Sequence, residues 1–241
     1  MGDAADCDIV QREADLNLGN EPIPLSVGNI IYLNGASSAG KSSLATALQA
    51  LLPAPYLHVG LDRFNGMFPP QYVAVQPFGR AVPPQAHEGL ILFHDIQDGC
   101  LRLEPHHGPA WDRLADGFRQ SIRALAVTGN NLIVDNVLTR RDVLRETVSA
   151  LAGLPLLFVK VDCPVDELER REKERGDRLL GLARWQHNQM ADWAVYDLVV
   201  DTSRHGPDEC ARQVAQLVAN PPEPSAFDRL RQSVYSVGEQ E

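Results

Sequence analysis

Eight consecutive residues have the types and the spacing of a phosphate-binding loop. Gly35 is followed by four residues and then by Gly40, Lys41 and Ser42, a pattern that holds a nucleoside triphosphate when a strand precedes it and a helix follows it. The glycines let backbone N–H groups turn inward, and a helix that begins near Lys41 adds its positive end. We expect the nucleotide to lie against the whole loop, namely Gly35, Ala36, Ser37, Ser38, Ala39, Gly40, Lys41, Ser42 and Ser43.

Charge and metal chemistry are expected from three residues. The ammonium group of Lys41 can reach the β and γ phosphates, and the hydroxyl of Ser42 is placed to ligate Mg²⁺. Asp135 follows the apolar run of "NLIVDNVL", and an acid at the end of a neighbouring strand holds the metal through its water ligands. Alternatively, Asp135 only ends the strand and caps the next helix. Asn136 beside it is either a second candidate for the metal site or a turn residue.

Asp62 is the predicted general base. It ends the strand-like stretch "PYLHVGLD", and the carboxyl end of a strand in the same sheet opens onto the phosphate site. A carboxylate there can accept the proton of an attacking hydroxyl. The alternative is that Asp62 caps a helix or pairs with Arg63 at the surface.

Three arginines recur at helical spacing in "ELERREKERGDRLL", at positions 171, 175 and 178. They share one helix face and could close over the triphosphate, where Arg171 would bind the nucleotide and Arg175 and Arg178 would neutralise the charge that develops during transfer. A solvated helix in which glutamates pair with these arginines is equally consistent with the spacing. Gly176 would break this helix.

The elements that must position these residues alternate between strand and helix. Apolar runs of strand length lie at 29–33, 56–61, 131–137, 155–161 and 197–201, and helical patterns fill three of the four gaps. This alternation predicts an α/β fold with a parallel sheet. We place the domain at residues 28–219, between an N-terminal extension (1–27) and a C-terminal tail (220–241) that follows "NPPEPS".

The remaining gap carries an insert at residues 63–109. Apolar and polar residues alternate on both sides of Asp98-Gly99, a dipeptide that favours a hairpin turn. The insert would form the acceptor pocket, with aromatic surface from Phe64, Phe68, Tyr72 and Phe78. The alternative is that these aromatic residues form a small core of the insert itself. His106 and His107 are interpreted as loop residues rather than metal ligands.

Composition narrows the classes of partner and compartment. A formal net charge of −10 argues against a nucleic acid or an anionic membrane surface as the partner. Four widely spaced cysteines, at 7, 100, 163 and 210, favour free thiols in a reducing compartment. No run of membrane-spanning length is present in the sequence, so the expected location is the cytoplasm.

Together, the stretches "IIYLNGASSAGKSSLATALQALLPAPYLHVGLD", "NLIVDNVL", "RREKERGDR" and "YDLVVDTS" resemble the chloramphenicol phosphotransferase family of P-loop kinases. The resemblance spans about residues 28–218 and includes self-resistance kinases for nucleoside antibiotics of the capuramycin type. It implies a five-stranded parallel sheet like that of nucleoside monophosphate kinases, ATP or GTP with Mg²⁺, and a hydroxylated small molecule as acceptor. It also implies that Asp62 is the base and that residues 167–190 form a lid carrying the three arginines.

Other classes of nucleotide-binding protein are alternatives to a small-molecule kinase. A GTPase switch would be expected to carry an N-K-x-D motif, and none of the three lysines follows an asparagine. A polynucleotide kinase would need a basic groove with interleaved aromatic residues, and the net charge of −10 argues against such a groove. A kinase of metabolites or nucleosides and a non-catalytic nucleotide-binding regulator remain alternatives, and the sequence leaves open whether the protein forms a homo-oligomer.

Overall fold

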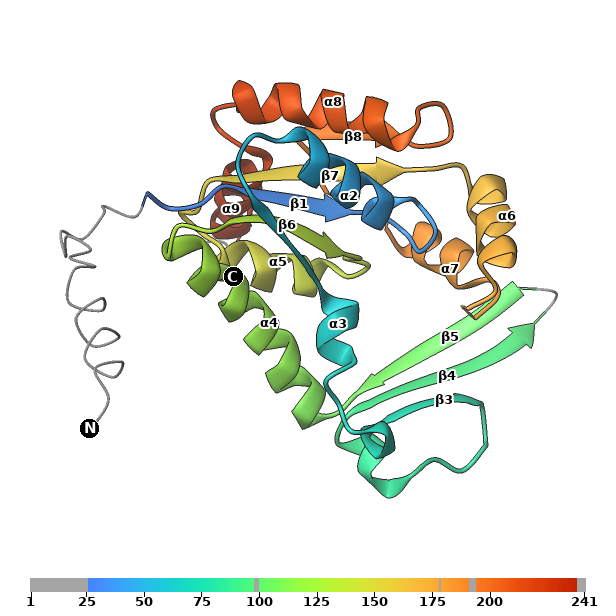
Figure 1. Ribbon diagram of the computed structural model, residues 1–241. Coiled ribbons are helices and arrows are strands. Elements are labelled where there is room, and N and C mark those ends of the chain that lie inside the picture. Colours follow the sequence, from blue (N-terminus) through green and yellow to red (C-terminus); the bar gives the residue numbers. More distant parts are fainter. Residues whose placement is uncertain (1–25, 98–99, 178, 191–193, 238–241) are drawn as a thin grey trace, which may run out of the picture.

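The computed structural model describes residues 26–97, 100–177, 179–190 and 194–237, and a five-stranded parallel sheet lies at its centre (Figure 1). The strand order is β2-β6-β1-β7-β8. These strands confirm the predicted α/β fold and all five predicted strand positions to within a few residues. Their bounds are Ile30–Asn34 for β1, Tyr56–Gly60 for β2, Asn131–Asn136 for β6, Leu156–Asp162 for β7 and Leu198–Asp201 for β8.

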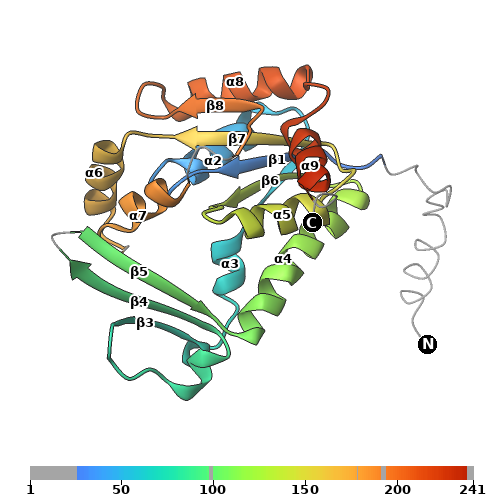
Figure 2. The same cartoon turned by 180° about the vertical axis from the view of Figure 1, so that it is seen from behind.

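Helices cover both faces of the sheet (Figures 1 and 2). One face packs against α2 (Lys41–Leu51) and α8 (Pro207–Ala219), and the other against α4 (Pro109–Val127), α5 (Arg141–Ala150) and α9 (Ala226–Val237). Because the central strand β1 is buried on both faces, all five of its residues are at most 1% exposed. This explains why the strand has a continuous apolar run in place of an alternating pattern.

The core extends beyond the predicted domain boundary at residue 219. Ala226, Phe227 and Leu230 of α9 are buried, and the Phe227 ring lies 5.0 Å from that of Phe158 on β7. Asp197, just before β8, accepts a hydrogen bond from the Ala226 N–H at 2.6 Å. The prolines in "NPPEPS" interrupt the regular secondary structure, but the apolar face of the next helix still packs against the sheet. Most of the predicted N-terminal extension lies outside the described residues.

The insert between β2 and β6 folds into a small helix and a second sheet. After α3 (Leu61–Asn65) come two short 3₁₀ turns, η1 (Pro70–Tyr72) and η2 (Pro84–His87), and a three-stranded sheet of order β3-β4-β5. Its strands are β3 (Val73–Pro77), β4 (Leu90–Gln97) and β5 (Cys100–His107).

The predicted hairpin in the insert is present. Strands β4 and β5 are antiparallel with Gln97 opposite Cys100, which leaves two residues for the turn. Those two, Asp98 and Gly99, lie outside the described residues. The interpretation of His106 and His107 as loop residues is wrong, because both belong to β5 and pair with β4.

Two helices follow β7 in the segment predicted to be the lid, α6 (Val165–Arg175) and α7 (Leu182–Gln189). As predicted, α6 ends at Gly176, whose φ of 69° is accessible at low cost only to glycine. The buried carboxylate of Glu172 on α6 accepts hydrogen bonds from the N–H groups of Gly181 and Ala183 at the start of α7. This carboxylate fixes the two helices to each other. In the described part of the chain, no helix has both the length and the apolar character needed to cross a membrane.

Candidate nucleotide and acceptor site

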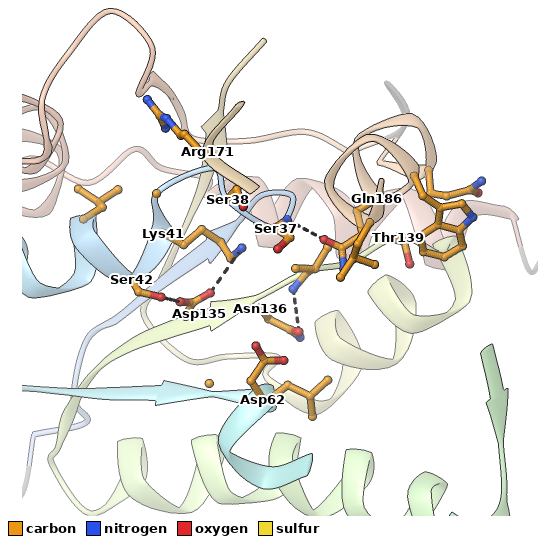
Figure 3. A pocket seen from close by; sticks show the side chains of 18 of the residues that line it. Ser37, Ser38, Lys41, Ser42, Asp62, Asp135, Asn136, Thr139, Arg171 and Gln186 are labelled. Atoms are coloured by element: carbon orange, nitrogen blue, oxygen red, sulfur yellow. Dashed lines mark hydrogen bonds and ion pairs between the residues drawn. The ribbon is translucent and has the colours of Figure 1, made fainter. Parts of the chain in front are cut away.

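One large cavity opens at the carboxyl ends of β1, β2 and β6 (Figure 3). Its volume is about 1190 Å³. The loop after β1, the start of α3, one face of the β4–β5 hairpin and helix α7 all contribute to its wall. Segments distant in sequence therefore meet around a single space that is large enough for two small molecules.

The predicted phosphate loop connects β1 to α2 as expected. Gly40, with a φ of 92°, stands immediately before the helix, which begins at Lys41. A Cβ on Gly35 would lie 2.5 Å from the carbonyl oxygen of Val161 on β7, so this position has no room for a side chain. Ser37, Ser38, Gly40, Lys41, Ser42 and Ser43 line the cavity, whereas Ala36 and Ala39 are buried behind the loop.

Lys41, Ser42 and Asp135 meet in a single cluster (Figure 3). The Ser42 hydroxyl donates a hydrogen bond to Oδ2 of Asp135 at 2.8 Å, and Nζ of Lys41 lies 3.7 Å from Oδ1 of the same carboxylate. Nζ also donates to the carbonyl oxygens of Gly35 and Ala36 at 2.8 and 3.0 Å. Strand β6 thus brings its acid to the phosphate loop across 93 residues of chain.

The surroundings of Asp135 keep its carboxyl group ionised. Burial alone would raise the pKa, but the imidazole of His58 beside it, the charge of Lys41 and the Ser42 hydroxyl together lower the pKa below its ordinary value. Nε2 of His58, on β2, lies 3.6 Å from the carboxylate. Asp135 and Ser42 supply the hard oxygen atoms that Mg²⁺ prefers, so this pair fits a magnesium site.

Asp62 lies on α3, two residues beyond the end of β2, rather than on the strand itself. Its side chain lines the cavity from the side opposite the phosphate loop and points toward the end of β6 (Figure 3). The structure therefore places the predicted base and the phosphate loop across a shared space, which is the arrangement that transfer to an intervening hydroxyl requires.

The structure describes two of the three predicted lid arginines. Arg171 lines the cavity and donates to the side-chain and backbone oxygens of Thr202 at 3.1 and 2.8 Å. It also pairs with Glu167 at 2.7 Å, the kind of contact that the solvated-helix interpretation predicts. Arg175 lines the cavity and pairs with Asp177 at 2.7 Å, while Arg178 lies outside the described residues.

The predicted aromatic residues of the insert face away from this cavity. Phe64 packs on Phe118 of α4 with ring centres 5.0 Å apart, and none of the four lines the cavity wall. Phe68 stacks on Tyr72, and Phe78 stacks on Phe93 of β4. Phe64 therefore packs on the main core beside α4 and the other three rings pack within the insert, so the assignment of all four to the acceptor pocket is not supported.

A different set of residues forms the wall opposite the phosphate loop. The rings of His107 and Trp111 stack with centres 3.6 Å apart, and the Trp111 Nε1–H donates to Oδ1 of Asn65 at 3.2 Å. Burial, and secondly the charge of Arg140, lowers the pKa of His107, so this ring is neutral near pH 7. The apolar part of the wall comes from the cavity-facing side of the hairpin: Leu90, Leu92, Leu103 and Pro105.

Sequence reasoning missed several cavity residues because they have no local signature. Thr202 follows β8, and its hydroxyl donates to the carbonyl oxygen of Ala39 at 2.8 Å. Gln186 of α7 accepts a hydrogen bond from the Ser37 N–H at 2.6 Å. Asn136 also lines the cavity, but its side chain is engaged within the fold, where it donates to the Tyr32 hydroxyl at 2.8 Å and accepts from the Val137 N–H.

Known sequences similar to this chain are described as phosphotransferases. The family described as chloramphenicol phosphotransferase-like protein matches residues 28–219. Two curated proteins of Mycobacterium tuberculosis, both described as candidate O-phosphotransferases, are each 34% identical over 209 residues, which cover 87% of this chain and 90% of theirs.

Solved structures share the fold at low sequence identity. The adenosine phosphosulfate (APS) kinase of Mycobacterium tuberculosis, in complex with AMPPNP and APS, is 15% identical with a TM-score of 0.54 and covers 80% of this chain and 99% of its own. A sugar kinase of Janibacter sp. is 16% identical with a TM-score of 0.54 and covers 82% of this chain and 98% of its own. These likenesses confirm the P-loop kinase fold.

Proposed function

Since the chain belongs to the chloramphenicol phosphotransferase-like family of O-phosphotransferases, we propose that it transfers the γ-phosphate of ATP or GTP to a hydroxyl group of an antibiotic. The observation that carries the proposal is the position of Asp62 across one cavity from the phosphate loop. Chloramphenicol and nucleoside antibiotics of the capuramycin type are the candidate acceptors, and phosphorylation would confer resistance or self-resistance.

The cavity residues would have different roles in phosphoryl transfer. Asp62 would accept the proton of the acceptor hydroxyl while the hydroxyl oxygen attacks the γ-phosphorus and the nucleoside diphosphate leaves. Lys41, with Arg175 from α6, would neutralise the charge that spreads over the transferred group, and Arg171 would bind the nucleotide. Lys41 is only 8% exposed, so its charge acts in a partly desolvated site where electrostatic stabilisation is strong.

Magnesium would be held at the carboxylate of Asp135 and the hydroxyl of Ser42. An ion held there would supply positive charge that offsets the negative charge of the phosphate oxygens. Asp135 suits this role because its lowered pKa keeps it ionised and because the Ser42 hydroxyl and the Lys41 ammonium group hold the carboxylate in place.

The size and lining of the cavity support a drug-like acceptor. With apolar residues from the hairpin on one side and a stacked His107–Trp111 pair beside them, the wall opposite the phosphate loop suits a molecule with an apolar face and a few polar groups. A polyol would leave much of this wall in contact with water.

A nucleotide-consumption screen tests the proposal directly. The full chain is incubated with ATP or GTP, Mg²⁺ and one member of a panel of hydroxylated antibiotics, nucleosides, sugars and polyols, and product masses are measured. We expect a mass increase of one phosphoryl group on an antibiotic, with no such product from an Asp62→Asn variant. Phosphorylation of sugars or nucleosides alone would overturn the antibiotic assignment, and no product from any acceptor would overturn the kinase assignment.

A further inference from the structure

The lid helix α7 places a side-chain amide directly on the phosphate loop. Oε1 of Gln186 accepts a hydrogen bond of 2.6 Å from the backbone N–H of Ser37, and Figure 3 shows this contact at the edge of the cavity. The two residues are 149 positions apart, so the fold alone brings them together. This contact has no role in the functions described above.

The contact belongs to a well-anchored face of α7. Leu182, Trp185, Gln186 and Gln189 all line the cavity, and their spacing of three, one and three residues puts them on one side of a helix. Glu172 holds the start of α7 through two backbone N–H groups, and Arg184 pairs with Glu169 of α6 at 2.6 Å. Gln186 is therefore presented by a rigid support.

The chemistry of the amide determines what Gln186 offers to a ligand. A carboxamide has one acceptor oxygen and an NH₂ group with two donors on its opposite side. Because the Ser37 N–H uses the oxygen, the NH₂ group must point away from Ser37. Nε2 meets no hydrogen-bond acceptor among the described residues, and Gln186 lines the cavity. The phosphate loop itself thus orients a neutral hydrogen-bond donor.

We propose that the NH₂ group of Gln186 donates a hydrogen bond to an oxygen of the transferred phosphoryl group. The inference rests on the proposed phosphotransferase function and adds a catalytic residue to it. A neutral donor suits this place, because the charge of the phosphoryl oxygens is already opposed by Lys41 and the lid arginines, while a positioned donor still strengthens its bond as charge develops. The same contact makes the geometry of α7 depend on the phosphate loop.

Three variants separate this role from a purely structural one. Gln186→Ala removes the donor and the acceptor. Gln186→Glu keeps an oxygen for the Ser37 N–H but replaces the donor with a negative charge. Asn188→Ala is the matched control, because it truncates an exposed amide on the same helix that does not line the cavity.

The measurements are the nucleotide Kd, from calorimetry with a non-hydrolysable triphosphate, and the rate of phosphoryl transfer at saturation, both to an acceptor and to water. We expect the rate of Gln186→Ala to fall on the order of 10²-fold, the usual effect of losing one such donor, with a Kd changed by less than about threefold, since a donor that acts mainly in the transition state adds little to ground-state binding. Gln186→Glu should be at least as slow, and Asn188→Ala should match the unmodified protein. Thermal melting and a Gln186→Asn variant check that a loss of rate is not a loss of fold.

Two results would overturn the inference. A Gln186→Glu protein with an unchanged rate would mean that only the oxygen bound to Ser37 matters. A Gln186→Ala protein that binds nucleotide more tightly at an unchanged rate would mean that Gln186 competes with phosphate for the Ser37 N–H. Transfer to water needs no known acceptor, so hydrolysis without any phosphorylated hydroxyl would contradict the antibiotic assignment and leave the Gln186 comparison intact.

Discussion

The hydroxyl of Ser42 donates a 2.8 Å hydrogen bond to the carboxylate of Asp135 and so joins the first turn of α2 to strand β6. Lys41, the preceding residue, approaches the other oxygen of the same carboxylate at 3.7 Å. The hydroxyl, the carboxylate and the ammonium group therefore hold one another in place before any ligand enters. Such preorganisation reduces the reorganisation that accompanies binding and transfer.

Asp135→Asn should weaken the use of magnesium more than the binding of nucleotide. An amide has half the acceptor oxygens and no charge, and loss of a residue that supports a metal through hydrogen bonds typically costs 10- to 100-fold in metal affinity. The measurement is the transfer rate as a function of Mg²⁺ concentration, with Asp166→Asn, an exposed residue of α6, as the control. An unchanged magnesium titration would mean that Asp135 serves only the fold.

Lys41→Ala should abolish transfer while the protein still folds. The ammonium group is nearly buried and stands at the centre of the phosphate loop, where a lost positive charge removes on the order of several kcal/mol of transition-state stabilisation. Turnover is compared with that of Lys173→Ala, which removes a lysine from the exposed surface of α6. Full activity in a folded Lys41→Ala protein would contradict the kinase assignment.

Local patterns in the sequence were sufficient for the phosphate loop, the five strands and the approximate position of Asp62. The loop could be predicted because its backbone conformation depends on a short run in which Gly35 and Gly40 have no substitute. The residues of the cavity wall could not be predicted. The alternation of apolar and polar residues in the hairpin shows which residues share a face but not which face points toward the cavity. That choice depends on packing with Ala74 and Ala86, which cover the Ile91 side of the hairpin.

Long-range contacts explain the other differences. Gln186 meets Ser37, and α9 returns to β7, only because α7 and the C-terminal chain fold back toward the sheet. Neither segment contains a sequence motif that identifies the residues it contacts. His58 was missed for a similar reason, because its neighbour Asp135 becomes adjacent only when β2 pairs with β6.

Asp62→Asn should separate nucleotide binding from chemistry. The amide has nearly the same shape but cannot take a proton, so the transfer rate should fall by roughly 10²- to 10⁴-fold, the usual contribution of a positioned base. Nucleotide affinity should stay close to that of the unmodified protein, because the side chain faces the loop from across the cavity. If affinity collapses while the saturated rate is retained, Asp62 is a structural or metal-site residue.

Tyr32 should make the fold sensitive to alkaline pH. Burial raises the pKa of this phenol from 10.0 to about 12, even though a hydrogen bond with Asn136 opposes the shift. Between these values the unfolded chain has lost the proton and the folded protein retains it, so the free energy of unfolding falls as pH rises through this window and is unaffected below it. Two pKa units correspond to about 2.7 kcal/mol.

The measurement for Tyr32 is denaturant unfolding at several values between pH 9 and pH 12, with Tyr32→Phe for comparison. The phenylalanine variant should begin less stable, because Asn136 loses its partner, but should lose less stability across the window. Equal slopes for the two proteins would show that the Tyr32 hydroxyl does not titrate as described.

Trp111→Ala should raise the acceptor KM without changing the nucleotide KM. The indole is held by Asn65 and stacked on His107 at the wall opposite the phosphate loop, so its loss would remove apolar contact area worth about 1.5 kcal/mol or more, a KM increase of roughly tenfold. Phe68→Ala is the informative control. That ring stacks on Tyr72 and does not line the cavity, so its truncation should lower the melting temperature and leave the acceptor KM unchanged. If Phe68→Ala raises the acceptor KM and Trp111→Ala does not, the acceptor binds on the other face of the insert, where Phe78 and Phe93 stack.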